Sequence, residues 1–70
     1  MTRSNSQNLA KKIESLRKKQ ELSQEKLARL ADVSNNTIIN IEAGINTNPT
    51  IETLRRIAKA LNVSMEDLIK

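Results

Sequence analysis

Apolar residues recur along this chain at the spacing of amphipathic helices, and no segment alternates long enough between apolar and polar residues to predict a strand. The first stripe predicts a helix over about residues 5–19. Its members lie at positions i, i+4 and i+7, and they are Leu9, Ile13 and Leu16. The lysines of the same segment fall on other faces, so this helix is expected to present one side to a core and the rest to solvent.

Two short helices are predicted next, each beginning after a serine that is suited to the N-cap position. Ser23 precedes the first, over about residues 24–31, and Ser34 precedes the second. The second is expected to end at Gly44, because glycine readily takes the left-handed conformation that closes many helices. The expected inward residues are Leu27, Ala28 and Ala31 in the first helix, and Ile38 and Ile41 in the second.

The remaining third of the chain predicts two further helices after a loop at residues 45–49. Thr50 caps a helix over about residues 51–61 that Asn62 closes, and Ser64 caps a short last helix with Asp67 near its positive end. Their apolar residues are Ile51, Leu54, Ile57, Ala58 and Leu61, followed by Met65, Leu68 and Ile69. We therefore predict an all-α, compact five-helix domain over residues 1–70, with residues 1–5 as a flexible N-terminal arm.

Composition removes several classes of function. The 70 residues include no cysteine and no histidine, so the chain lacks thiolate metal ligands and the commonest general base. The carboxylates are scattered and no glycine-rich loop is present, so we predict no enzymatic activity, no cofactor and no metal site. No apolar run approaches the roughly 20 residues that cross a bilayer, and the N-terminus has no secretory pattern. The expected location is the cytoplasm.

The link between the second and third predicted helices is unusually short. Only Asp32 and Val33 lie between Ala31 and the next cap, and so short a turn makes two helices cross steeply, as in a helix-turn-helix. Asp32 stands where the backbone is expected to turn through positive φ, which Asp tolerates better than most residues. The small Ala28 suits a close approach of the two helices.

The ordered set of fragments from residue 9 to residue 69 resembles the Xre/Cro/C1-type, or lambda-repressor-like, helix-turn-helix family. The fragments are "LSQ" before the second helix, "VS" before the third, "IINIEAG" at its end, a proline before the fourth, and "LRRIAKALNVSMEDLI". The resemblance implies that the third helix lies in the major groove of double-stranded DNA while the second crosses above the phosphates. The implied function is sequence-specific DNA binding by a transcriptional repressor or regulator, and the net charge of +4 is compatible with it.

The same resemblance assigns candidate DNA contacts. The residues expected to face base edges are Asn35, Asn36, Ile39 and Asn40, and those expected to contact the DNA backbone are Gln24, Ser34, Thr37, Asn46 and Thr47. Because asparagine can bond in bidentate fashion to adenine, we hypothesise an A·T-rich operator. Two alternatives stay open: Asn35 and Asn36 also suit the start of a helix, and Ile39 can pack on Ile45 or touch thymine methyl groups.

The resemblance also implies a structural ion pair between Arg17 and Glu42, which would join the first helix to the end of the third. Met65, Leu68 and Ile69 of the last helix are expected to belong to the core first, and a homodimer through the same helix is an additional expectation. Dimerisation would matter here because residues 30–54 contain no Lys or Arg, and DNA affinity depends strongly on phosphate neutralisation. The same lack of cations supports an alternative function as a protein-interaction module of this fold, such as an antitoxin or adaptor.

Overall fold

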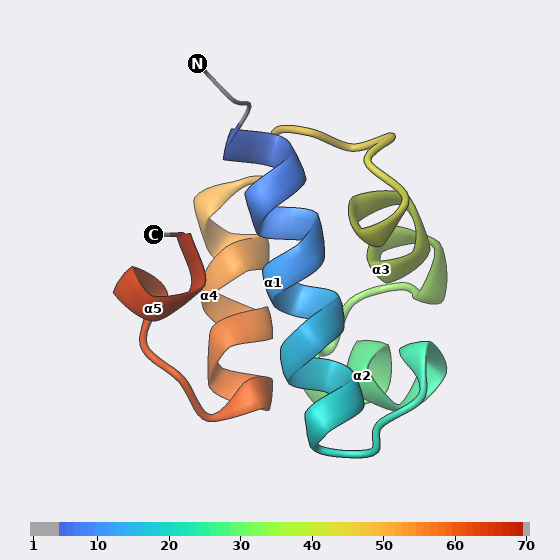
Figure 1. The fold of residues 1–70 in the computed structure, drawn as a ribbon. Helices are drawn as coiled ribbons and strands as arrows, with labels where there is room; N and C mark the ends of the chain where they lie inside the picture. Colours follow the sequence, from blue (N-terminus) through green and yellow to red (C-terminus); the bar gives the residue numbers. More distant parts are fainter. Residues whose placement is uncertain (1–4, 70) are drawn as a thin grey trace.

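The computed structural model describes residues 5–69, with side chains from Leu9 onward, and this segment contains five α-helices and no strand. The helices are α1 (Asn5–Lys19), α2 (Gln24–Ala31), α3 (Asn35–Glu42), α4 (Ile51–Leu61) and α5 (Met65–Ile69) (Figure 1). The all-α prediction and the positions of the helices are thus confirmed. Most of the arm expected at residues 1–5 lies outside the described residues, but Asn5 is the first residue of α1.

A serine or threonine begins each of the four helices α2 to α5. The hydroxyl oxygens of Ser23, Ser34, Thr50 and Ser64 accept backbone N–H groups three residues onward, at 3.0, 3.1, 3.1 and 3.0 Å. Each bond satisfies a donor that the first turn of a helix otherwise leaves without a partner. The four starting points predicted from the sequence are therefore fixed by local hydrogen bonds.

Within the described residues, α1, α2, α3 and α4 each end in a residue of left-handed backbone conformation. Asp32 (φ 59°), Asn62 (φ 62°) and Gly44 (φ 79°) stand where the sequence predicts such turns. Glu21, at φ 59°, closes α1 in the same manner, although Glu has no particular preference for this conformation and sequence reasoning missed it. These turns satisfy carbonyl groups at the helix ends and redirect the chain abruptly.

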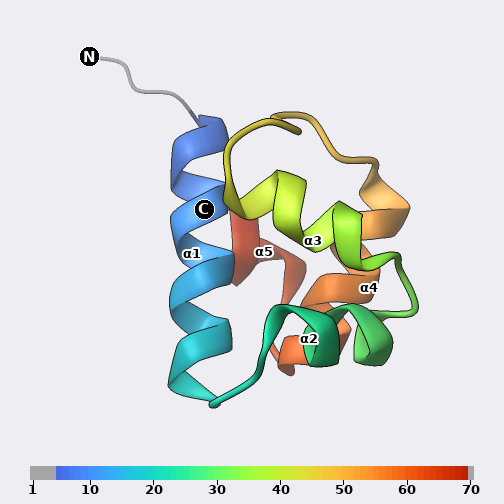
Figure 2. The ribbon, with the colours of Figure 1, turned by 90° about the vertical axis from the view of Figure 1, so that its right-hand side faces the viewer.

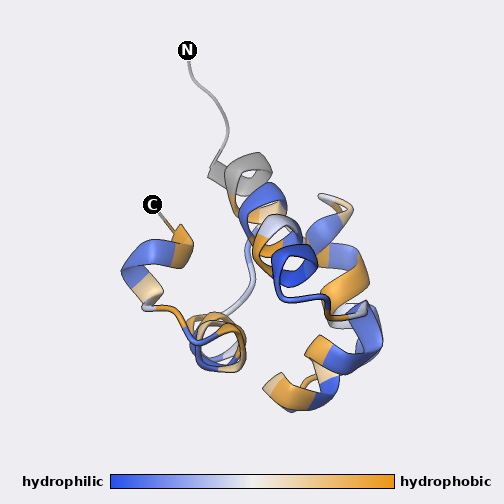
Figure 3. Cartoon of the chain, turned by 60° about the horizontal axis from the view of Figure 1, so that its bottom comes forward, coloured by the Kyte–Doolittle hydropathy of each residue, from blue (hydrophilic) through white to orange (hydrophobic). Residues whose placement is uncertain are grey.

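The hydrophobic core lies between all five helices and contains no aromatic residue. Its buried apolar members are Leu9, Ala10, Ile13, Leu27, Ala28, Ala31, Ile38, Ile41, Ile57, Ala58, Leu61 and Leu68. Each helix carries both apolar and polar segments, as amphipathic spacing requires (Figure 3). Leu68 is only 1% exposed, so its assignment to the core is confirmed, whereas its additional role as a dimer contact is wrong.

The packing of the helices leaves α2 and α3 together on one side of the molecule. The α2 helix packs against both α3 and α4, while α1 packs against α3 and α5. Figure 2 shows α2 and α3 towards the viewer, with α1 beside them on one flank and α4 on the other. Within the described residues, none of the helices has the length and hydrophobicity needed to cross a membrane. The exposed pair α2 and α3 is the part of the fold that carries the candidate site.

Candidate nucleic-acid interface

The turn between α2 and α3 is built from backbone hydrogen bonds. The N–H of Val33 donates to the carbonyl of Ala28 at 3.0 Å, and the N–H of Asp32 donates to that of Arg29 at 3.2 Å. Arg56 of α4 donates from Nη1 to the carbonyl of Asp32 at 2.9 Å, and its guanidinium lies 3.5 Å from the Asp32 carboxylate. Ala28 is only 3% exposed, as a close helix crossing requires. The turn is therefore held both from within and from α4.

The two faces of α3 differ sharply. Ile38 and Ile41 are 0% and 1% exposed and anchor the helix in the core. Asn35 and Asn36 are exposed, and Asn40 is half-buried. No hydrogen bond joins these three side-chain amides to another described residue. The outer face of α3 thus presents amide groups whose donors and acceptors are available to a ligand.

Four other candidate contact residues lie at the start of α3 or in the loop after it, and three of them already make hydrogen bonds within the chain. The hydroxyls of Ser34 and Thr37 lie 2.8 Å apart while Ser34 also caps α3. In the loop, Asn46 Oδ1 accepts the N–H of Asn48 at 3.2 Å, and Thr47 beside it is exposed. Ser34 and Thr37 therefore lie at the start of α3 and Asn46 and Thr47 in the loop after it. Hydrogen bonds within the chain already restrict the side chains of Ser34, Thr37 and Asn46. Ile39, the fourth base-facing candidate, is half-buried on α3.

A largely buried ionic cluster joins α1 and the start of α2 to the last residue of α3. Arg17 donates to both carboxylate oxygens of Glu42, from Nε to Oε2 at 2.7 Å and from Nη2 to Oε1 at 3.0 Å. Its Nη1 donates to the carbonyl of Leu22 at 2.8 Å. The side chains of Arg17 and Glu42 are only 11% and 4% exposed. The pair therefore fixes the end of α3 against α1 in a region largely shielded from water.

Gln24 is the third member of this cluster, and the sequence alone did not reveal its role. Its Nε2 donates to Glu42 Oε1 at 3.0 Å, so the amide orientation is set by a buried carboxylate. One amide hydrogen and the carbonyl oxygen of Gln24 are left over for a further partner. The hydrogen bond with Glu42 also raises the pKa of Arg17, outweighing the opposite effect of burial. Both charges of the cluster are thus matched within the fold.

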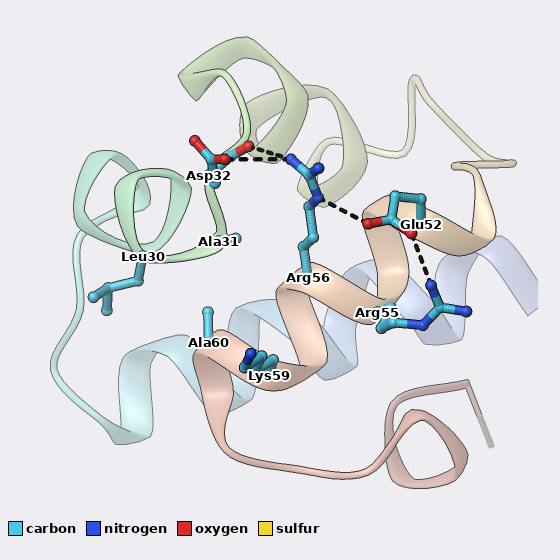
Figure 4. A pocket seen from close by; sticks show the side chains of 8 residues that line it. All are labelled: Leu30, Ala31, Asp32, Glu52, Arg55, Arg56, Lys59 and Ala60. Atoms are coloured by element: carbon cyan, nitrogen blue, oxygen red, sulfur yellow. Dashed lines mark hydrogen bonds and ion pairs between the residues drawn. The ribbon is translucent and has the colours of Figure 1, made fainter.

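A groove lies along the junction of α2 and α4 (Figure 4). It has a volume of about 610 Å³ and is lined by Leu30, Ala31, Asp32, Glu52, Arg55, Arg56, Lys59 and Ala60. Glu52 accepts from Arg55 at 2.7 Å and from Arg56 at 3.1 Å, so two of the three cations are paired. None of the residues assigned to base contacts lines this groove.

Comparison with known proteins identifies the fold. A helix-turn-helix family model matches residues 13–68. The restriction-modification controller protein C.AhdI from Aeromonas hydrophila superposes with a TM-score of 0.85 at 25% identity, covering 90% of this chain and 94% of that one. No curated protein matches the chain by sequence.

Two further solved structures, both of an enzyme, contain a region whose fold is similar to that of this chain. Hydroxypropylphosphonic acid epoxidase from S. wedmorenis gives a TM-score of 0.83 at 26% identity, over 99% of this chain but 36% of that protein. The structure described as apo-HppE gives 0.80 at 26% identity, over 93% and 36%. The chain therefore corresponds to little more than a third of these proteins, whereas it spans nearly all of the controller protein. With its two-residue turn and its match over residues 13–68, the chain belongs to the Xre/Cro/C1-type helix-turn-helix family of DNA-binding regulators.

Proposed function

We propose that this regulator reads an A·T-rich operator with the outer face of α3. The observation that carries the proposal is the set of amides on this face that make no hydrogen bond within the described residues, beside a buried cluster that fixes the helix. Asparagine matches the N6 donor and N7 acceptor of adenine in the major groove. The assigned base contacts are Asn35, Asn36, Ile39 and Asn40.

The DNA backbone contacts in this proposal flank α3 on both sides. Gln24 at the start of α2 offers the amide hydrogen that Glu42 leaves free, and the N-terminus of α2 adds backbone donors and a favourable dipole. The hydroxyls of Ser34 and Thr37 contact the backbone of one DNA strand, and Asn46 and Thr47 contact the backbone of the other. These are neutral hydrogen bonds, which position a protein on the duplex but release few counterions.

A homodimer would compensate for the small number of ionic contacts. Two protomers bound to half-sites about 34 Å apart contribute their affinities together. Ile69 of α5 is 55% exposed and Met65 is half-buried, so these two residues are the proposed apolar contacts. Leu68 is excluded because it belongs to the core. Action as a repressor follows if the bound dimer overlaps a promoter.

Selection of bound sequences from random DNA, followed by titration of the chosen duplex against a scrambled one, tests the proposal. Wild-type protein is expected to prefer the selected duplex, and Asn36→Ala should lose about 1–3 kcal/mol and relax one base pair. Asn62→Gly is the matched control, because it removes an asparagine amide from the end of α4 where the backbone is left-handed. Equal binding of both duplexes by the wild-type protein at moderate salt would refute the proposal.

A second candidate is a protein-interaction module such as an antitoxin or adaptor. The observation in its favour is that residues 30–54, which include α3, carry no Lys or Arg. On this alternative, the protein would form a stoichiometric complex with one partner and show no preference among DNA sequences. Recovery of one stoichiometric protein partner without retained DNA would favour this second function, whereas retention of the selected duplex without such a partner would favour the first.

A further inference from the structure

The groove at the junction of α2 and α4 combines exposed apolar surface with positive charge. Leu30 lies on its α2 side and is 52% exposed, although Leu27 and Ala31 of the same helix are buried. Ala31 and Ala60 line the groove beside it. Packing within the described residues covers only about half of the Leu30 side chain, so the other half is available to a partner.

The α4 side of the groove carries positive charge that the fold neutralises only in part (Figure 4). Arg56 is fixed, because it donates to the carbonyl of Asp32 at 2.9 Å and to Glu52 at 3.1 Å. Arg55 also bonds to Glu52, at 2.7 Å, but its side chain remains 62% exposed. Lys59 is exposed and forms no ion pair with another described residue. Three cations and two carboxylates line the groove, which leaves one positive charge in excess.

This groove is distinct from the residues assigned to DNA. None of the residues proposed to contact bases or the DNA backbone lines it. The charges are divided in the same way, because residues 30–54, which include α3, contain no Lys or Arg, whereas α4 carries three cations. Operator reading by α3 therefore does not use the cations of α4. The charge of the groove is complementary to an acidic partner.

We propose that the groove binds an extended acidic segment of a partner protein, in which an aliphatic residue lies between two carboxylates. Arg55 and Lys59 are separated by one turn of α4, so their positions differ by about 6 Å along the helix axis. Alternate residues of an extended chain are about 6.6 Å apart and point to the same side. Two carboxylates at alternate positions therefore match the two cations. The residue between them points to the α2 side, where Leu30 is exposed.

A short peptide in which leucine lies between two glutamates, flanked by glycine and serine, is the probe that tests the groove. Titration of this peptide into isotope-labelled protein is expected to shift the amide signals around Leu30, Arg55 and Lys59, and the shifts should saturate. A peptide with glutamine in place of glutamate should bind about two- to fivefold more weakly for each charge removed, the range of exposed ion pairs. Replacement of its leucine by glycine should weaken binding roughly tenfold, because apolar burial is lost.

Variants of the protein separate this groove from a general attraction between an acidic peptide and a basic protein. Lys59→Gln should weaken binding about two- to fivefold, and Leu30→Ala should weaken it roughly tenfold. Lys11→Gln is the matched control, because Lys11 is an exposed lysine of α1 outside the groove, and it should bind the peptide as the wild type does. Lys59→Glu should prefer a peptide with lysine at one of the two glutamate positions. All four variants change exposed side chains, so they should unfold near the wild-type temperature.

The proposal is wrong if the groove signals do not respond to the peptide, or if the glutamate and glutamine peptides bind equally well. Unchanged binding in both Lys59→Gln and Leu30→Ala would also overturn it. Signals that shift with protein concentration alone would show that a second copy of the chain occupies the groove, and signals that respond only to the selected duplex would show that DNA does. Reading of DNA by α3 is tested separately by the duplex titration and does not depend on these outcomes.

Discussion

Removal of one charge from the buried cluster behind α3 is expected to cost far more stability than removal of a surface charge. The Arg17 side chain is 11% exposed in the wild type, and Glu42→Leu removes the carboxylate that its guanidinium binds at 2.7 and 3.0 Å. The same substitution leaves the Gln24 amide without its acceptor. Arg17→Met leaves the Glu42 carboxylate, 4% exposed, without its counter-charge. Burying an unpaired charge is the reason for the expected loss in both variants.

The magnitude can be set against the total stability of so small a domain. Breaking one side of a buried pair costs about 3–5 kcal/mol, whereas 70 residues at 0.05–0.15 kcal/mol each give about 3.5–10 kcal/mol in all. At about 4–8 °C per kcal/mol, each single variant should melt at least about 12 °C lower. In the double variant no charge is stranded. The main remaining costs are the lost bonds of the Leu22 carbonyl and of the Gln24 amide, about 1 kcal/mol each.

Urea unfolding of the wild type, both single variants and the double variant, followed by circular dichroism, measures these differences. The double variant should be more stable than either single variant, so that the coupling between the two positions is at least about 2 kcal/mol. The exposed pair Lys18–Glu14, at 3.2 Å, is the control, and its double-mutant cycle should give no more than about 0.5 kcal/mol. Additive losses at Arg17 and Glu42 would show that the cluster does not act as a unit.

The direction of the Arg17 pKa shift also sets a pH dependence. Its pKa is raised in the folded state, mainly by the hydrogen bond to Glu42. A raised pKa contributes stability at every pH below the unfolded value, and that contribution is lost only as the pH rises through the folded value. Both values lie in strongly alkaline solution for arginine. Stability curves measured between neutral and moderately alkaline pH should therefore show no loss from this group.

Three further outcomes are expected. Glu21→Gly should raise the urea midpoint and the unfolding free energy by about 0.5–1 kcal/mol, because glycine takes the left-handed conformation at this position without steric strain from a side chain. An unchanged or lower midpoint would contradict this. Leu68→Ala should lose about 2–5 kcal/mol, whereas Ile69→Ala should keep its stability and weaken dimerisation in sedimentation experiments. The logarithm of operator affinity should fall with the logarithm of salt at a slope shallower than about −4 per protomer, since each ionic contact adds about −0.9.

Local sequence information predicts only part of the candidate site. The caps of α3 and the left-handed turn at Asp32 depend on bonds within a few residues, so they can be predicted from Ser34, from Gly44 and from the short link at Asp32. The partner of Gln24 is 18 residues away and the partner of Arg56 is 24 residues away. No spacing rule connects residues so far apart, and for this reason the family resemblance assigned Gln24 to the DNA backbone without showing that Glu42 also binds it.

The sequence by itself determined where each helix begins and ends and which face is apolar, because these features follow from short-range hydrogen bonds and helical periodicity. It did not distinguish Leu68, which is 1% exposed, from Ile69, which is 55% exposed, although the two are neighbours with the same chemistry. Nor did it show that Ile45 stays outside while Val33 and Val63 pack inward from identical turns. The tertiary structure decided these outcomes, because burial depends on which helix lies opposite and not on the residue's own preference.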